Sequence, residues 1–379
     1  MKFLLEILGM TSQCNLRCNY CDWKKDKYFE LSEEQKRNMK RNISNIKKVV
    51  DREFPEIRRV EYSGGEPFMY PEIVEEILET FPQKWIRIIT NGLLMKDEHL
   101  EKIKNHGKAF IAISLDGNTL DANYSRFQDN EKIFNQVIEN MKKVIEKKIP
   151  LMILCTINKH NIDQFTNYVE YLEKNYKEEI ENGMIVMPAH FVTNYSKENG
   201  MPSLEQKNNL INWIKNDIDK YTLVSSIKSH YQSLAKYMEA NKKIHHCKIN
   251  EWNICMHFRE NEIVSDGKFL SFRCGMRGVG ELGLFNINDD NSVKKYVDIV
   301  KDDNFLKDFD ENIKFPKHDN KYSEYNLLDL DCQSKCFVDW TIIDYIVNGY
   351  VSYKESAKWF VMFKDRNVND FIKEYSSGC

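Results

Sequence analysis

The sequence lacks any long apolar run: no stretch of about 18 apolar residues, the length that signals a membrane-spanning helix, occurs in it. Its first residues, Met1 to Leu8, include Glu6 and form too short an apolar stretch for the core of a signal peptide. We therefore expect neither export nor a membrane partner, and we interpret this first stretch as a strand.

The sequence also lacks an excess of charge of either sign. Its 55 Lys and Arg residues nearly balance its 58 Asp and Glu residues, and the formal net charge is −3. Nothing global indicates nucleic acid or an acidic membrane surface as a partner. The basic stretch at 36–48 is diluted by Glu33, Glu34 and Asp51, so we interpret it as the solvated face of a helix.

Export signals are absent, yet the chain has 10 cysteines among its 379 residues. Without export, this number favours free thiols and metal ligands over disulfides. We therefore expect the protein in a reducing cytoplasm.

Three of these cysteines, Cys14, Cys18 and Cys21, stand together in a short polar loop. A loop this short can direct three thiolates at one metal centre but cannot easily supply a fourth. Thiolates hold iron–sulfur clusters, normally four to a cubane. Three would leave one iron open for a small molecule, as a catalytic metal keeps an open position. A zinc loop and a chance cluster are the alternatives, although zinc sites usually show two pairs of ligands.

Short apolar segments alternate with amphipathic helical segments through the first 225 residues. The segments expected as strands are Phe3–Met10, Arg59–Ser63, Trp85–Thr90, Phe110–Leu115, Leu151–Ile157 and Met184–Met187. The segments expected as helices are Ser32–Arg52, one opening at Pro71, Lys96–His106, Glu131–Lys148, Ile162–Asn175 and Leu204–Tyr221. Nearly all-apolar strands are typical of parallel sheets covered on both sides. Six such units predict an α/β fold, a partial (β/α)6 TIM-like barrel, over residues 1–225.

The alternation stops near Lys228, and residues 226–379 are expected to form a smaller, cysteine-rich α+β domain with C-terminal helices. Within it, Asn261–Ser265 and Lys268–Arg273 flank Asp266-Gly267, which is a strong signal for a two-residue hairpin turn.

The cysteine loop and three later motifs resemble, in order, those of the radical S-adenosylmethionine (SAM) enzymes. Cys14, Cys18 and Cys21 match the family's cysteine signature, and Ser63-Gly64-Gly65-Glu66-Pro67 looks like its GGEP motif. Its later strand-end motifs resemble Thr90-Asn91-Gly92 and Ser114-Leu115-Asp116-Gly117. The resemblance covers about residues 1–225 and implies a six-unit partial barrel. It also implies a [4Fe-4S] cluster that binds SAM at the open iron, and reductive cleavage of SAM to a 5′-deoxyadenosyl radical that removes hydrogen from substrate.

The resemblance also implies which residues surround SAM. Gly64 and Gly65 would let the backbone approach its methionyl amino group, and Glu66 would add a charge-assisted bond. The other expected contacts, at strand ends or in the cysteine loop, come from Asn91, Ser114, Arg126 and Tyr20. Some of these residues have a simpler alternative: Gly64 and Gly65 can form a plain turn, Arg126 can lie on the surface, and Tyr20 can pack in the core.

A second cysteine set resembles the SPASM or twitch extensions of radical SAM enzymes, which carry auxiliary four-iron clusters. The resemblance lies in Cys255, the Asp-Gly hairpin, Cys274 and Gly283-Leu284-Phe285-Asn286-Ile287. Cys332 and Cys336 would complete a set of four ligands for one auxiliary [4Fe-4S] cluster. A structural zinc site with the same thiolates is the alternative. Cys247 and Cys379 have no assigned role, and Cys155 is expected as a free buried thiol.

Enzymes with this pairing of domains often modify ribosomally made peptides, by crosslinking, thioether formation or epimerisation. We expect such a peptide as substrate and flavodoxin or ferredoxin as electron donor. The cysteines follow about a dozen residues after the start of the sequence, and we therefore expect no N-terminal peptide-recognition domain. A radical SAM dehydrogenase or epimerase of a small molecule is the alternative enzyme. A non-enzymatic iron–sulfur electron carrier is the alternative from another class, although it would need no SAM-binding motifs.

Overall fold

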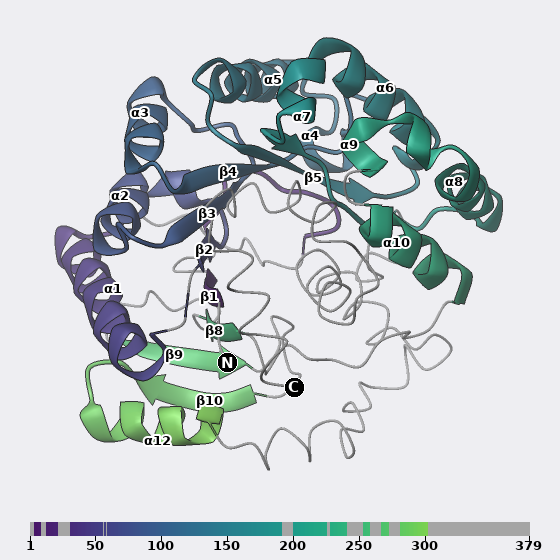
Figure 1. The fold of residues 1–379 in the computed structure, drawn as a ribbon. Helices are drawn as coiled ribbons and strands as arrows, with labels where there is room; N and C mark the ends of the chain where they lie inside the picture. Colours follow the sequence, from purple (N-terminus) through teal and green to yellow (C-terminus); the bar gives the residue numbers. More distant parts are fainter. Residues whose placement is uncertain are drawn as a thin grey trace. The chain divides into compact units, whose positions relative to one another are not determined.

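The computed structural model describes residues 4–8, 13–21, 31–55, 57, 59–191, 200–225, 228–240, 253–257, 267–272 and 281–301. The chain forms two compact units, and the division falls within β4 (Ala109–Ser114). Figure 1 shows both units with their helices and strands. None of the described helices is long and apolar enough to cross a membrane.

The first unit is a sheet with strand order β10-β9-β8-β1-β2-β3. Strands β8, β1, β2 and β3 run parallel, and β9 is antiparallel to both β8 and β10. Its strands are β1 (Leu4–Leu8), β2 (Arg59–Ser63), β3 (Trp85–Thr90), β8 (Asn253–His257), β9 (Lys268–Phe272) and β10 (Glu281–Asn286). Its helices are α1 (Glu33–Glu53), η1 (Pro67–Met69), α2 (Pro71–Thr80), α3 (Asp97–His106) and α12 (Asp290–Lys301).

Helix α1 shows how the sequence dictates these elements. A capping box forms at its start: Gln35 donates its backbone N–H to Ser32 Oγ at 3.2 Å, and Ser32 donates its backbone N–H to Gln35 Oε1 at 2.8 Å. Its apolar stripe, including Met39, Ile43 and Ile46, is fully buried. Burial of this stripe fixes α1 against the sheet.

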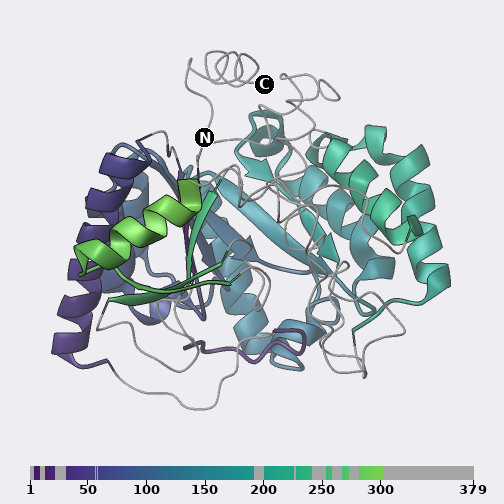
Figure 2. The ribbon, with the colours of Figure 1, turned by 90° about the horizontal axis from the view of Figure 1, so that it is seen from below.

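Helix α12 packs beside β10 and reaches α1, as Figure 2 shows. Lys301, its last residue, pairs with Glu53 at 2.9 Å and lies 5.4 Å from the ring centroid of Phe54. The turn before it holds Asn288, whose side chain accepts from Asn45 Nδ2 at 2.7 Å. These contacts join residues after 280 to the first helix.

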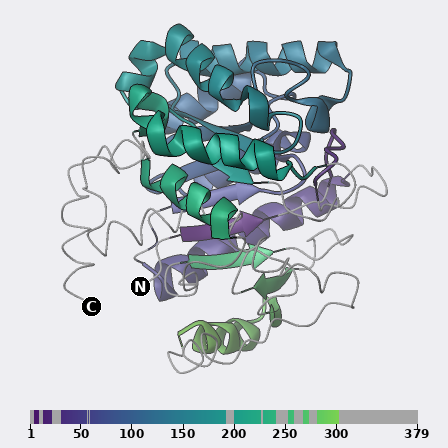
Figure 3. The same ribbon diagram turned by 90° about the vertical axis from the view of Figure 1, so that its right-hand side faces the viewer.

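The second unit contains the parallel strands β4, β5 (Leu151–Ile157) and β6 (Ile185–Val186), and β7 (Ala189–Phe191) also pairs with β5. The β4 and β5 side chains are almost all buried, as expected for strands covered on both faces. The helices are α4 (Tyr124–Phe127), α5 (Glu131–Glu146), η2 (Ile162–Gln164), α6 (Phe165–Asn175), α7 (Lys177–Glu181), α8 (Leu204–Asn216), η4 (Ile218–Lys220), α9 (Thr222–Ser225) and α10 (Lys228–Ala240). Figure 3 shows α8 and α10 side by side.

One predicted helix needs adjustment. The helix predicted over Leu204–Tyr221 ends at Asn216, because Asp217 leaves the helical backbone and a 3-10 turn, Ile218–Lys220, follows. The second hairpin arm is present as β9, whose described partners are β8 and β10. The predicted first arm, Asn261–Ser265, lies outside the described residues.

Candidate functional site

In the first unit, the Glu66 carboxylate joins the GGEP-like turn to the end of β3. It accepts hydrogen bonds from Thr90 Oγ1 at 2.6 Å, the Asn91 backbone N–H at 2.7 Å and the Phe68 backbone N–H at 3.1 Å. Its own backbone N–H donates to the Gln13 carbonyl at 2.7 Å, immediately before Cys14. Burial raises the pKa of Glu66 to about 7, although the three hydrogen bonds oppose the rise. Glu66 thus fixes the turn in place, and its predicted contact with SAM stays a prediction.

Two N–H donors surround the Cys14 sulfur within this unit. The Leu16 backbone N–H lies 3.4 Å from Sγ, and Asn91 Nδ2 lies 3.8 Å from it. Asn91 Nδ2 also donates to Asn15 Oδ1 at 2.7 Å, and the Asn15 amide nitrogen is buried without a hydrogen-bond partner. Donors aimed at a sulfur stabilise a thiolate and are a common feature of iron–sulfur ligands. The chemistry of this donor set fits a cluster ligand.

None of the three loop cysteines forms a disulfide. Cys14 and Cys18 are half-buried, and Cys21 is exposed. Across the part of the chain that the structure describes, no group of three or more His, Cys, Asp or Glu residues is arranged to hold a single metal ion. The cluster assignment therefore rests on thiol chemistry and spacing, and it stays a prediction.

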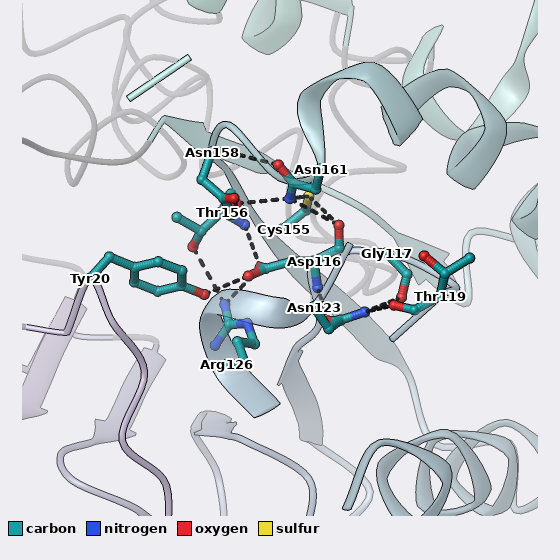
Figure 4. A network of polar contacts seen from close by, with 10 residues as sticks. All are labelled: Tyr20, Asp116, Gly117, Thr119, Asn123, Arg126, Cys155, Thr156, Asn158 and Asn161. Carbon is teal, nitrogen blue, oxygen red and sulfur yellow. Dashed lines mark hydrogen bonds and ion pairs between the residues drawn. The ribbon is translucent and has the colours of Figure 1, made fainter. Parts of the chain in front are cut away.

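In the second unit, Asp116 is the centre of a buried polar network at the end of β4 (Figure 4). Its carboxylate accepts from the Tyr20 hydroxyl at 2.6 Å and from the Thr156 backbone N–H at 2.8 Å, and it pairs with Arg126 at 2.9 Å. Sequence reasoning interpreted Asp116-Gly117 as a turn and missed this role. The available signal was a charged residue two positions after the end of a largely apolar strand.

Arg126 is buried, so the surface alternative is excluded for it. Burial lowers its pKa, but the charges of Asp116 and Tyr20 outweigh this effect and the pKa is raised. One terminal nitrogen serves Asp116 and lies 3.4 Å from Thr156 Oγ1, whereas Nε is buried and has no hydrogen-bond partner. An unsatisfied buried donor is costly, so Nε is the atom of this side chain best suited to an added acceptor such as a carboxylate.

Tyr20 points its hydroxyl into the same network, and the Arg126 guanidinium lies 5.3 Å from its ring centroid. Burial, chiefly, raises the pKa of Tyr20 well above its usual value. Ser114 is half-buried at the last position of β4, and Gly64 and Gly65 are half-buried after β2. Ser114, Gly64 and Gly65 thus lie at or just beyond strand ends, as expected, and Tyr20 lies in the cysteine loop.

Of the second cysteine set, the structure describes the backbone of Cys255, which lies in β8 opposite Phe272 of β9. The other predicted ligands, Cys274, Cys332 and Cys336, lie outside the described residues, as do Cys247 and Cys379. The auxiliary cluster stays a prediction. Cys155 is fully buried, as expected.

Comparison with known families identifies the N-terminal part of the chain. Residues 8–172 match the radical SAM superfamily. The chain contains a radical SAM domain. All three loop cysteines and the GGEP-like, Asn91 and Ser114 motifs lie within the matched residues.

Two curated relatives of the radical SAM domain differ in what their names say they do. The sporulation killing factor maturation protein SkfB of Bacillus subtilis is 28% identical over 168 residues, 43% of this chain and 38% of SkfB. A probable GTP 3′,8-cyclase of Archaeoglobus fulgidus is 29% identical over 171 residues, 42% of this chain and 53% of the cyclase. The alignments thus span about half or less of either relative.

A solved structure shares the fold over a longer range. Native anSMEcpe with bound AdoMet and Kp18Cys peptide covers 93% of this chain and 100% of its own, with 18% identity and a TM-score of 0.55. At this identity the likeness shows the fold. The prediction of an α/β radical SAM fold of parallel strands and helices is confirmed, and SAM and a [4Fe-4S] cluster are the cofactors of the radical SAM superfamily that residues 8–172 match.

Proposed function

We propose that this protein is a radical SAM enzyme that modifies a ribosomally made peptide. The observation that carries the proposal is the Cys14, Cys18 and Cys21 spacing inside the stretch that matches the radical SAM superfamily. Three thiolates in one loop leave one iron of a cubane without a protein ligand. That open position gives the cluster a place for SAM.

The residues around the loop have distinct roles in this proposal. When bound, the cluster supplies the electron that cleaves SAM and yields the radical that abstracts hydrogen. The Leu16 and Asn91 N–H donors lie against the sulfur of Cys14, which would be a ligand of the cluster. Glu66 holds the Gly64-Gly65 turn so that its backbone can approach the methionyl group. Nε of Arg126 is available to a carboxylate, and the Ser114 hydroxyl to the SAM ribose or carboxylate.

The peptide substrate is supported by the relatives. SkfB is named as a maturation protein of a sporulation killing factor, and anSMEcpe of the same fold has been solved with AdoMet and a peptide together. A second candidate, a radical SAM enzyme of a small molecule, is favoured by the likeness to a GTP 3′,8-cyclase.

The remaining parts of the proposal concern the rest of the chain. Residues 1–225 would form the radical SAM barrel, and residues 226–379 a SPASM/twitch-like domain. Cys255, Cys274, Cys332 and Cys336 would hold one auxiliary [4Fe-4S] cluster there. A flavodoxin or ferredoxin would supply electrons, in a reducing cytoplasm where the thiols persist.

The test is to incubate the anaerobically reconstituted enzyme with SAM, a reductant and the peptide encoded beside its gene, and then to measure the peptide's mass. A mass change that requires SAM, with 5′-deoxyadenosine released, is the expected result. Reactions without SAM or without reductant are the controls. An unchanged peptide together with SAM-dependent consumption of GTP would reject the peptide substrate in favour of the small-molecule candidate.

A further inference from the structure

The central segment of the cysteine loop, Cys18–Tyr20, belongs to the second unit, and three contacts within that unit hold it. The Asn19 backbone N–H donates to the Ser125 carbonyl at 2.8 Å, and the Tyr20 hydroxyl donates to Asp116 at 2.6 Å. The third contact is the Arg126 guanidinium over the Tyr20 ring. Ser125 and Arg126 both belong to α4. Asp116, which lies outside α4, also holds Arg126 in place through an ion pair.

Asp116 is itself held rigidly, as Figure 4 shows. Its backbone N–H donates to Asn123 Oδ1 at 2.8 Å, and its carbonyl accepts from Asn161 Nδ2 at 3.0 Å. Its carboxylate receives the Thr156 backbone N–H at 2.8 Å. Since its side chain is fully buried, these bonds are shielded from water and therefore count for more than on the surface.

The turn after Asp116 is equally constrained. Asn123 Nδ2 donates to the carbonyls of Gly117 at 2.7 Å and Thr119 at 2.8 Å. A Cβ at Gly117 would overlap that of Ala122, so only glycine fits there. The Asp116 carboxylate is therefore a fixed point, and the loop segment is the partner that has to be ordered.

We propose that Asp116 is a positioning residue: with Arg126 it clamps Tyr20, and so presents the Cys18 thiol to the cluster on a segment ordered before iron arrives. This proposal rests on the proposed function for its consequence, but the clamp is a property of the chain alone. A carboxylate suits the role because one Asp must accept from Tyr20, Arg126 and Thr156 at once, which needs both oxygens. A preformed ligand segment reduces the ordering cost of binding.

The sharpest variant is Y20F, which removes the hydroxyl and keeps the ring for packing. The matched control is Y221F, which removes a similar Tyr–carboxylate bond, from Tyr221 to Glu170 at 2.7 Å, elsewhere in the same unit. Hydrogen–deuterium exchange of the loop peptide in the iron-free full chain reports on the Asn19 amide. We expect its exchange to rise about tenfold in Y20F and in D116N and to stay unchanged in Y221F. Equal exchange in wild type and Y20F would overturn the clamp.

A second measurement separates positioning from plain stability. The measurement is a titration with SAM of the EPR spectrum of the reduced cluster, in wild type and Y20F samples reconstituted to equal iron content. We expect Y20F to need about tenfold more SAM than wild type for half of the spectral change. Because Asp116 acts on the loop through its bond to Tyr20, the double variant Y20F/D116N should need no more SAM than D116N alone. A SAM titration identical to that of Y221F would overturn the positioning role. If wild type with its cluster fails to cleave SAM, the proposed function falls, while the exchange result still decides the clamp.

Discussion

Glu66 is a carboxyl group held almost out of water, and its ionisation should be visible in the stability of the protein. Burial raises its pKa from 4.5 to about 7. Between these values the folded chain binds a proton that the unfolded chain has released, so this group's contribution to stability decreases as pH rises from about 4.5 to about 7. The decrease amounts to at most about 3 to 4 kcal/mol, since one pKa unit corresponds to about 1.4 kcal/mol.

Urea unfolding of the iron-free chain at pH 5, 6, 7 and 8 measures this effect as the difference between wild type and E66Q, because Gln does not ionise. Subtracting E66Q removes His99 and His106, whose lowered pKa values act in the opposite direction. We expect the stability of wild type relative to E66Q to fall over this pH range. A difference independent of pH would show that Glu66 is ionised throughout.

The residue scale is also where sequence analysis was least complete. Tyr20 and Arg126 were expected as ligands of SAM, but their shared contact with Asp116 was not expected. The Tyr20–Asp116 bond joins residues 96 positions apart, which no local pattern encodes. An Asp-Gly pair has turn propensity whatever its surroundings, so local pattern alone assigns Asp116 to a turn. Which residues share a buried site is decided by tertiary packing.

At the scale of elements, strand boundaries follow from the sequence where apolar runs coincide with burial. Arg59–Ser63, Trp85–Thr90 and Leu151–Ile157 form strands with the predicted boundaries. The parallel pairing of β8 with β1 was not predicted, since it joins residues about 250 positions apart and no local pattern encodes it. The end of α8 was missed because Asp217 and the 3-10 turn continue a helix-like apolar pattern.

Gly267 allows an element-scale test at the start of β9. Its φ is +79°, and a Cβ there would overlap the Asn288 side chain, which donates to Asn42 of α1 at 3.2 Å. G267A should therefore both strain the backbone and displace a contact between the β10–α12 turn and α1. We expect it to lower the free energy of unfolding by about 1–3 kcal/mol, measured by urea unfolding of the full chain.

The matched control is G107A. Gly107 has a similar φ of +75°, but nothing lies within 4 Å of the position of its Cβ. G107A should lower the free energy of unfolding only through strain of the backbone at positive φ, by about 1 kcal/mol. If G267A and G107A are equally destabilised, Asn288 adapts freely and the packing of this turn against α1 contributes little.

At the scale of the whole molecule, the number of metal atoms tests the proposed division into two cluster-bearing parts. Two thiolate-held cubanes correspond to about eight irons per chain after anaerobic reconstitution. Iron and zinc measured together by elemental analysis decide the matter. About four irons with one zinc would replace the auxiliary cluster by a zinc site, and about twelve irons would mean that Cys247 or Cys379 helps to hold a third cluster.

The most direct test of the whole account is the production of 5′-deoxyadenosine from SAM by the reduced, reconstituted protein, compared between wild type and the triple variant C14A/C18A/C21A. Wild type should release 5′-deoxyadenosine. The triple variant should release none while retaining about four irons in its auxiliary cluster, since the other cysteines are unchanged. Release of 5′-deoxyadenosine by the triple variant, or its absence from fully reconstituted wild type, would contradict the assignment of these three cysteines to a SAM-cleaving cluster.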